Sequence, residues 1–86
     1  MLHFDDTQND EQLAKLHKQE EALCRELGDK AGLSICLGNQ ALILAQLNNI
    51  PEAKKLANEA YSIAINNGFT ALAQQIKPIV DYVNNL

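Results

Sequence analysis

The sequence predicts an all-α domain of about four antiparallel helices, and three observations lead to this prediction. Leucine and alanine, both strong helix formers, are the commonest residues, with 13 and 11 copies among 86. Aromatic and β-branched residues are too few for several strands. Apolar residues recur three and four positions apart in four segments that turn residues separate. The expected helices span residues 10–27, 30–47, 51–66 and 70–84.

The first helix follows a polar segment without periodicity. We expect residues 1–9 to form a flexible N-terminal arm. Asn9 or Asp10 then provides the helix cap, and Gly28 ends the helix. Its apolar stripe consists of four leucines: Leu13, Leu16, Leu23 and Leu27.

Local turn signals bound the other helices. The second helix ends at Asn48-Asn49, where asparagine tolerates the left-handed conformation in place of glycine. Pro51 opens the third helix, because the first turn does not need its missing N–H. Gly68 separates the third helix from the fourth, and Pro78 inside the fourth predicts a kink or a break near residues 75–78. Connections this short make neighbouring helices antiparallel.

Composition and charge exclude several classes of protein. No run of about 18 apolar residues is present, and the N-terminus lacks the basic and apolar regions of a signal peptide. The formal net charge of −4 disfavours a nucleic-acid surface. Residues 1–29 carry a net charge of −5 and residues 30–86 carry +1, which either orients self-association or marks a solvated helix face. We therefore expect a cytoplasmic protein without nucleic-acid or membrane partners.

The chain repeats itself at an offset of 40 residues. Four pairs align at this offset: Leu16 with Leu56, Leu23 with Ile63, Gly28 with Gly68 and Ala31 with Ala71. A recurring helix–turn–helix unit is typical of a solenoid. We expect a partial repeat over residues 10–28, a full repeat over 30–67 and a capping helix over 70–86.

The full repeat resembles a tetratricopeptide repeat (TPR) of the longer, bacterial or kinesin-light-chain-like variety. The resemblance lies in Leu37-Gly-Asn-Gln-Ala41-Leu-Ile-Leu44, in Asn48-Asn-Ile-Pro-Glu-Ala53, and in Ala57 and Ala60. It implies that the small residues at Ala41, Ala53, Ala57 and Ala60 let the two helices of the repeat approach closely. It also implies a TPR solenoid fragment that binds a protein or peptide partner.

The two ends of the repeat array differ. In the capping helix, Lys77, Asp81 and Asn84 stand where Leu37, Ala41 and Leu44 stand in the full repeat, so its outer face is polar. The first helix instead lacks the partner that its repeat unit requires. We expect the chain to be the terminal part of a longer array, or to form a homo-oligomer through helices 10–27 and 30–47.

The resemblance implies binding residues on the first helices of the repeats. The candidates are Ile35, Asn39, Leu42 and Gln46 on the second helix, with Gln75, Ile79 and Tyr82 on the fourth. Asn39 matches an asparagine that contacts the backbone of an extended peptide in kinesin-light-chain-like repeats. An amide suits this role because it both donates and accepts hydrogen bonds. Alternatively, Asn39 forms a hydrogen bond with a neighbouring helix.

The sequence offers little support for catalysis. Cys24 and Cys36 are expected to be reduced, partly buried thiols. His17, Glu20, Glu21 and Cys24 share a helix face and could hold zinc with Cys36, or His17 could be a solvated histidine beside acidic residues. We favour the second interpretation, and expect no metal site and no cofactor. The predicted function is a non-catalytic protein–protein interaction module; the alternatives are a structural self-association segment or a regulatory sensor domain of a larger protein.

Overall fold

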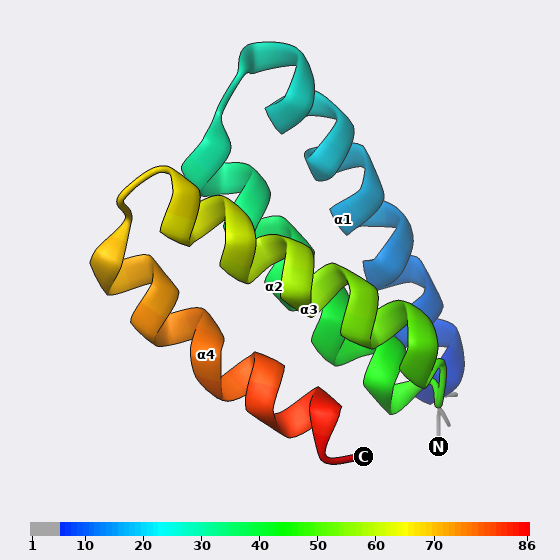
Figure 1. Ribbon diagram of the computed structural model, residues 1–86. Coiled ribbons are helices and arrows are strands. Elements are labelled where there is room, and N and C mark those ends of the chain that lie inside the picture. The colour runs from blue at the N-terminus through cyan, green and yellow to red at the C-terminus, as the bar shows by residue number, and fades with distance from the viewer. Residues whose placement is uncertain (1–5) are drawn as a thin grey trace.

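The structure is a computed structural model that describes the backbone of residues 6–86 and the side chains of residues 12–86. This part of the chain forms four helices and no strand: α1 (Asp6–Leu27), α2 (Lys30–Gln46), α3 (Ile50–Asn66) and α4 (Thr70–Asn84). Each helix runs antiparallel to the one before it, and α1 and α4 lie at opposite edges of the molecule (Figure 1). The predicted all-α fold is confirmed. None of the four helices is long and apolar enough to cross a membrane.

The first helix begins earlier than predicted. We expected residue 10 as its start, but α1 begins at Asp6, so residues 6–9 are helical rather than part of an arm. Residues 1–5 of the expected arm lie outside the described residues. The polar segment contains no glycine or proline, and acidic residues near a helix N-terminus interact favourably with the helix dipole. A lack of apolar periodicity was therefore a poor reason to exclude a helix.

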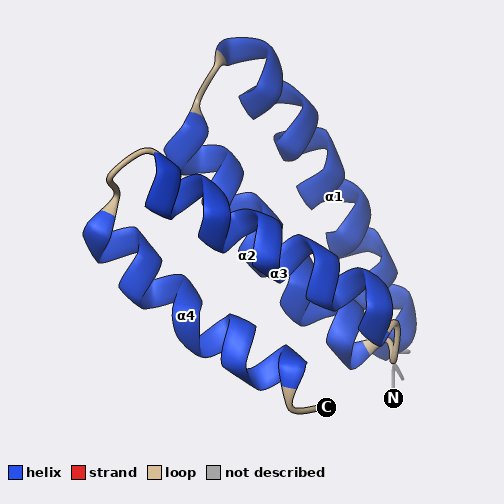
Figure 2. Ribbon diagram, viewed as in Figure 1, coloured by secondary structure: helices blue, strands red, loops and turns tan. Residues whose placement is uncertain are grey.

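Three similar turns connect the helices (Figure 2). Gly28, Asn48 and Gly68 lie twenty residues apart and adopt left-handed φ angles of 71°, 64° and 71°. After each of them, the next backbone N–H donates to the carbonyl oxygen five residues earlier at 2.8–2.9 Å. This hydrogen bond closes a helix C-terminus and requires the left-handed residue. The prediction that Asn48 replaces glycine in this conformation is confirmed.

The starts of α2, α3 and α4 follow the predicted signals to within one residue. Asp29 caps α2, because its carboxylate accepts a hydrogen bond from the N–H of Gly32 at 2.9 Å. Pro51 is the second residue of α3, which begins at Ile50 instead of residue 51. α2 ends at Gln46 instead of residue 47.

Small residues bring α2 and α3 into close contact. Four alanines at their interface are fully buried: Ala41, Ala53, Ala57 and Ala60. The hydroxyl of Ser34 on α2 donates to the backbone carbonyl of Ala60 on α3 at 2.7 Å, which requires the helices to approach within the length of a serine side chain. Leu37 and Leu56 fill the space beside these alanines. The core is therefore thin and depends on small volumes at defined positions.

The fourth helix packs on both α2 and α3. It crosses α2 at Gly38, where a Cβ atom would lie 3.5 Å from the Cδ1 atom of Ile79. A glycine at this position allows the close approach of the two helices.

Pro78 does not break α4. Of the predicted kink or break near residues 75–78, the break does not occur, because α4 continues without interruption from Thr70 to Asn84. Pro78 and Gln74 are exposed. The Gln74 carbonyl, which loses its intrahelical partner at Pro78, is therefore near water, and the lost bond costs less than it would in the core.

Candidate functional site

Four of the seven predicted binding residues line one groove between α2 and α4. Ile35 and Asn39 come from α2, while Gln75 and Ile79 come from α4. The groove has a volume of about 130 Å³, and Leu72 completes its wall. The crossing of α4 over α2 at Gly38 forms its base. The fold therefore places residues that are some forty positions apart in the sequence at one surface site.

A second, more open hollow continues this groove. Its volume is about 450 Å³, and it shares Ile35, Leu72 and Gln75 with the groove. Phe69 and Ala31 add apolar surface at the start of α4 and of α2. We call the two hollows together the α2–α4 groove.

Within residues 12–86, no charged side chain lines the α2–α4 groove. Asn39 and Gln75 supply its amide groups, and both residues are exposed. Among the described side chains, neither amide forms a hydrogen bond with a neighbouring helix, so the alternative role considered for Asn39 is not seen. Two free amides beside apolar side chains can bind peptide groups and contact apolar side chains at the same time.

The other three predicted residues do not line the groove. Leu42 and Gln46 lie further along α2, and Tyr82 lies further along α4. Helical periodicity places residues on one stripe of a helix but does not show where along it a second helix crosses. Leu72 and Phe69, which also line the groove, were not among the predicted binding residues. A glycine in the interior of the second helix was the available signal for the crossing point.

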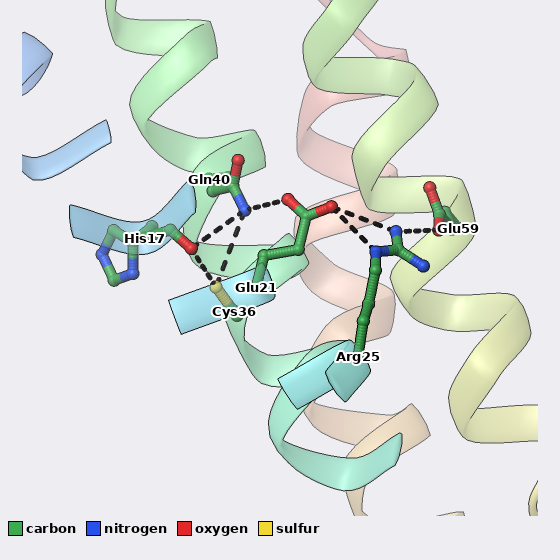
Figure 3. Close-up of polar contacts among 6 residues, drawn as sticks. All are labelled: His17, Glu21, Arg25, Cys36, Gln40 and Glu59. Atoms are coloured by element: carbon green, nitrogen blue, oxygen red, sulfur yellow. Dashed lines mark hydrogen bonds and ion pairs between the residues drawn. The ribbon is translucent and has the colours of Figure 1, made fainter. Parts of the chain in front are cut away.

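A network of polar side chains connects α1 to α2 and α3 (Figure 3). Gln40, which is only 2% exposed, donates from Nε2 to the Glu21 carboxylate at 2.8 Å. The other oxygen of Glu21 accepts from Nε of Arg25 at 3.1 Å. Arg25 also donates from Nη2 to Glu59 on α3 at 2.9 Å. The network sets the register of α1 on α2, because a shift of one turn would leave Gln40 buried without its partner.

The network determines the protonation of Glu21. Burial alone would raise the pKa of its carboxyl group, but the hydrogen bonds from Gln40 and Arg25 outweigh burial and lower the pKa. The same pairing with Glu59 and Glu21 raises the pKa of Arg25. Glu21 is therefore held as a carboxylate.

His17 and Cys24 on α1 lie near α2, which carries Cys36, but within the described residues these three side chains do not form a metal-ligand cluster. The Cys36 thiol donates to the backbone carbonyl of His17 at 2.7 Å, and Nδ1 of His17 lies 3.4 Å from the Glu20 carboxylate. Within the described residues, no three histidine, cysteine or acidic side chains are placed to hold a metal ion. Both cysteines are free thiols, and burial is the main cause that raises their pKa values. A raised pKa makes a thiol a weak nucleophile at neutral pH.

Another hollow, of about 250 Å³, lies between α3 and α4 beside their connecting turn. Tyr61, Ile65 and Lys77 are among the residues that line it. None of the predicted binding residues reaches it. The groove between α2 and α4 thus remains the candidate site.

Comparisons with protein families, with curated proteins and with solved structures found no match to this chain.

Proposed function

We propose that this chain is a non-catalytic protein-interaction module of the TPR type, in which the α2–α4 groove binds an extended peptide segment of a partner protein. The observation that carries the proposal is the convergence of Ile35 and Asn39 with Gln75 and Ile79 in one groove. Among the described side chains, the two amides there have no hydrogen-bond partner, and apolar side chains lie beside them.

Helix packing supports the proposal that the chain is of the TPR type. The alanines that the resemblance assigns to close helix contacts, Ala41, Ala53, Ala57 and Ala60, are fully buried. α2 contacts both its own partner α3 and the later helix α4, as a first helix does in a stacked array.

The lining of the groove indicates the chemistry of the bound segment. An extended backbone presents N–H and carbonyl groups that Asn39 and Gln75 can pair with at any sequence. Leu72 and Phe69 favour an apolar side chain in the wider hollow, and the lack of charge in the lining gives an acidic or basic side chain no counterpart. Because a single pair of helices forms the groove, we expect weak binding, in the micromolar range or above.

The experiment begins with selection of binding peptides from a library of short random sequences. The affinity of the selected peptides is then measured by fluorescence anisotropy for the wild-type chain and for Asn39→Ala. Loss of two neutral hydrogen bonds to a peptide group is expected to weaken binding about tenfold.

Gln46→Ala provides the matched control, because Gln46 is also an exposed amide on α2 but lies outside the groove. It should leave the affinity unchanged. Leu72→Glu tests the apolar wall and should abolish binding while the far-UV circular dichroism spectrum is retained. Equal affinity of the wild-type chain and both groove variants would refute the proposal.

A further inference from the structure

The hollow between α3 and α4, which we call the α3–α4 cavity, combines an apolar lining with hydrogen-bond donors. Its volume is about 250 Å³, just below the range of about 300–1,000 Å³ that is typical of sites for drug-sized ligands. Ala64 and Ala73 are buried at its lining, and Ile65, which is 52% exposed, adds an apolar side chain. The polar residues that line it are Tyr61, Thr70, Gln74 and Lys77. Such a lining suits a small ligand that has one apolar and one polar part.

The α3–α4 cavity is positively charged, although the chain carries a net charge of −4. Within the described part of the chain, Lys77 is the one charged residue that lines it. Lys77 forms no ion pair with a described acidic side chain, and this includes Asp81, the one acidic residue of α4. Tyr61 and Gln74 form no side-chain hydrogen bond within the same described residues. The cavity therefore offers one cation and free donors to an anion.

The internal repeat shows what the equivalent residues of α1 and α2 bind. At the offset of 40 residues, Ile65 corresponds to Arg25, which donates to the Glu59 carboxylate at 2.9 Å. Gln74 corresponds to Ser34, whose hydroxyl donates to a backbone carbonyl of α3 at 2.7 Å. At this place in the fold, the first pair of helices thus binds acceptor oxygens, one of which belongs to a carboxylate.

A further helix is poorly suited to supply such acceptors to α4. α2 packs on α3 with Leu37 and Ala41 fully buried, whereas α4 carries Lys77 and Asp81 at these positions of the repeat, and both are exposed. A helix packed as closely on α4 as α3 packs on α2 would take both charges out of water. Lys77 lines the cavity but Asp81 does not, so a small ligand can pair with the lysine and leave the aspartate in water.

We infer that the α3–α4 cavity binds a small organic monocarboxylate, with its carboxylate at Lys77 and its apolar group against Ile65 and the buried alanines. One carboxylate matches the single positive charge of the lining, whereas a doubly charged phosphate would exceed it. An ion pair to an exposed lysine contributes little to affinity by itself, so the apolar group supplies most of the binding. For a ligand of this size we expect a Kd of about 0.1–1 mM.

Titration of the isotope-labelled full chain with phenylacetate, followed by heteronuclear NMR, tests the site. We expect saturable shifts of backbone amide signals that are largest in residues 61–77. Phenylacetamide has nearly the same size but no charge, and it should bind about fivefold more weakly. The inference is overturned if phenylacetate at about 10 mM, well above the expected Kd, shifts no signal in residues 61–77. Equal affinity for phenylacetate and phenylacetamide also overturns it.

Two variants test the two parts of the site. Lys77→Met removes the charge but keeps an aliphatic stem, and it should weaken phenylacetate binding about fivefold. Ile65→Ala reduces the apolar contact and should weaken binding about threefold. Lys55→Met is the matched control, because Lys55 is also an exposed lysine but lies on α3 outside the cavity. It should leave the affinity unchanged, and all three variants should keep their helix content because the replaced side chains are exposed. Equal losses in Lys77→Met and Lys55→Met would contradict the inference.

The C-terminus of a peptide that ends in phenylalanine carries the same two groups as phenylacetate. A short peptide of this kind should bind at the cavity more weakly than phenylacetate, because ordering its other residues costs conformational entropy. Tighter binding of the peptide there would overturn the assignment to a free acid. The α2–α4 groove shares Thr70 with the cavity but neither Ile65 nor Lys77. Peptide binding by the groove should therefore persist in Lys77→Met, and it reports on the proposed function alone.

Discussion

Asn48 shows how much of the fold depends on single backbone angles. It is the only residue other than glycine with a left-handed φ among the described residues. The other two turns place glycine at the equivalent position. Asparagine tolerates this conformation better than other side chains, but a Cβ atom still carries a steric cost there.

Substitutions at Asn48 should therefore separate backbone strain from side-chain contacts. Asn48→Ala is expected to lower the free energy of unfolding by about 1 kcal/mol, and Asn48→Gly should change it by no more than about 0.5 kcal/mol. Urea unfolding followed by circular dichroism measures both changes. An alanine variant as stable as the wild type would show that the turn does not hold the left-handed angle.

The residues of the turns were predictable from the sequence because their signals are local. Asn48, Pro51 and Gly68 act through their own φ preferences, and the structure confirms each of them. Gln40 was not predictable in this way. It is nearly fully buried, and its burial depends on a carboxylate supplied by α1, nineteen residues earlier.

At the scale of elements, α1 differs from the other helices in how it is attached. Its contacts to α2 include the Gln40–Glu21 hydrogen bond and the Cys36 thiol bond to the His17 carbonyl, and Arg25 reaches Glu59 on α3. Polar contacts of this kind fix register but contribute less free energy than apolar burial. We expect α1 to be the helix most sensitive to solvent conditions.

Acidification should weaken the attachment of α1 to α2, because protonation of Glu21 weakens its hydrogen bonds with Gln40 and Arg25. The folded chain lowers the pKa of this carboxyl group, so its stabilising contribution is complete above the ordinary glutamate pKa and is lost as the pH falls through the folded value. Glu21→Gln removes this contribution. At neutral pH, we expect the variant to be about 1 kcal/mol less stable than the wild type. The difference should shrink as the pH falls through and below the ordinary glutamate range.

Thermal unfolding at one fixed protein concentration measures this effect. Glu26→Gln is the charge-matched control, because Glu26 is exposed on α1 and has no role in the network. It should follow the wild type at every pH. A difference between wild type and Glu21→Gln that stays constant on acidification would contradict the assigned role of Glu21.

The bounds of α1 and α4 show where element prediction from sequence failed. Residues 6–9 have no apolar periodicity, yet nothing in them opposes a helix, and α1 includes them. Pro78 was expected to kink or break α4, but the helix continues through it, and the exposed position of Pro78 reduces the cost of the missing hydrogen bond. At Pro78 the outcome depended on solvent exposure, which the helical pattern alone did not give.

At the scale of the whole molecule, stability depends on the small volume of the α2–α3 interface. Ala60 is fully buried, and its carbonyl accepts the hydroxyl of Ser34. Ala60→Leu is expected to lower the free energy of unfolding by about 3 kcal/mol, because it forces the two helices apart and breaks this hydrogen bond. Ala22→Leu, at an exposed alanine of α1, should have little effect. Urea unfolding compares the two, and equal stability would mean that the interface can expand.

Only part of the candidate groove could be predicted from the sequence. Periodicity placed Ile35 and Asn39 on one stripe of α2, and the forty-residue offset placed Gln75 and Ile79 at the matching positions of α4. The sequence did not show that α4 crosses α2 at Gly38. A crossing point depends on how two helices fit together, so Leu42, Gln46 and Tyr82 could not be excluded in advance.

The equal spacing of the three turns has a consequence for how such a chain can grow. Gly28 and Gly68 share the same left-handed angle, so residues 29–68 form a segment that starts and stops at equivalent backbone geometry. A tandem duplication of this segment would insert one more helical pair without requiring a new kind of junction. The polar outer face of α4 would remain at one edge and the exposed leucines of α1 at the other. Duplication of residues 29–68 would thus lengthen the groove while the outer surfaces of α1 and α4 stay unchanged.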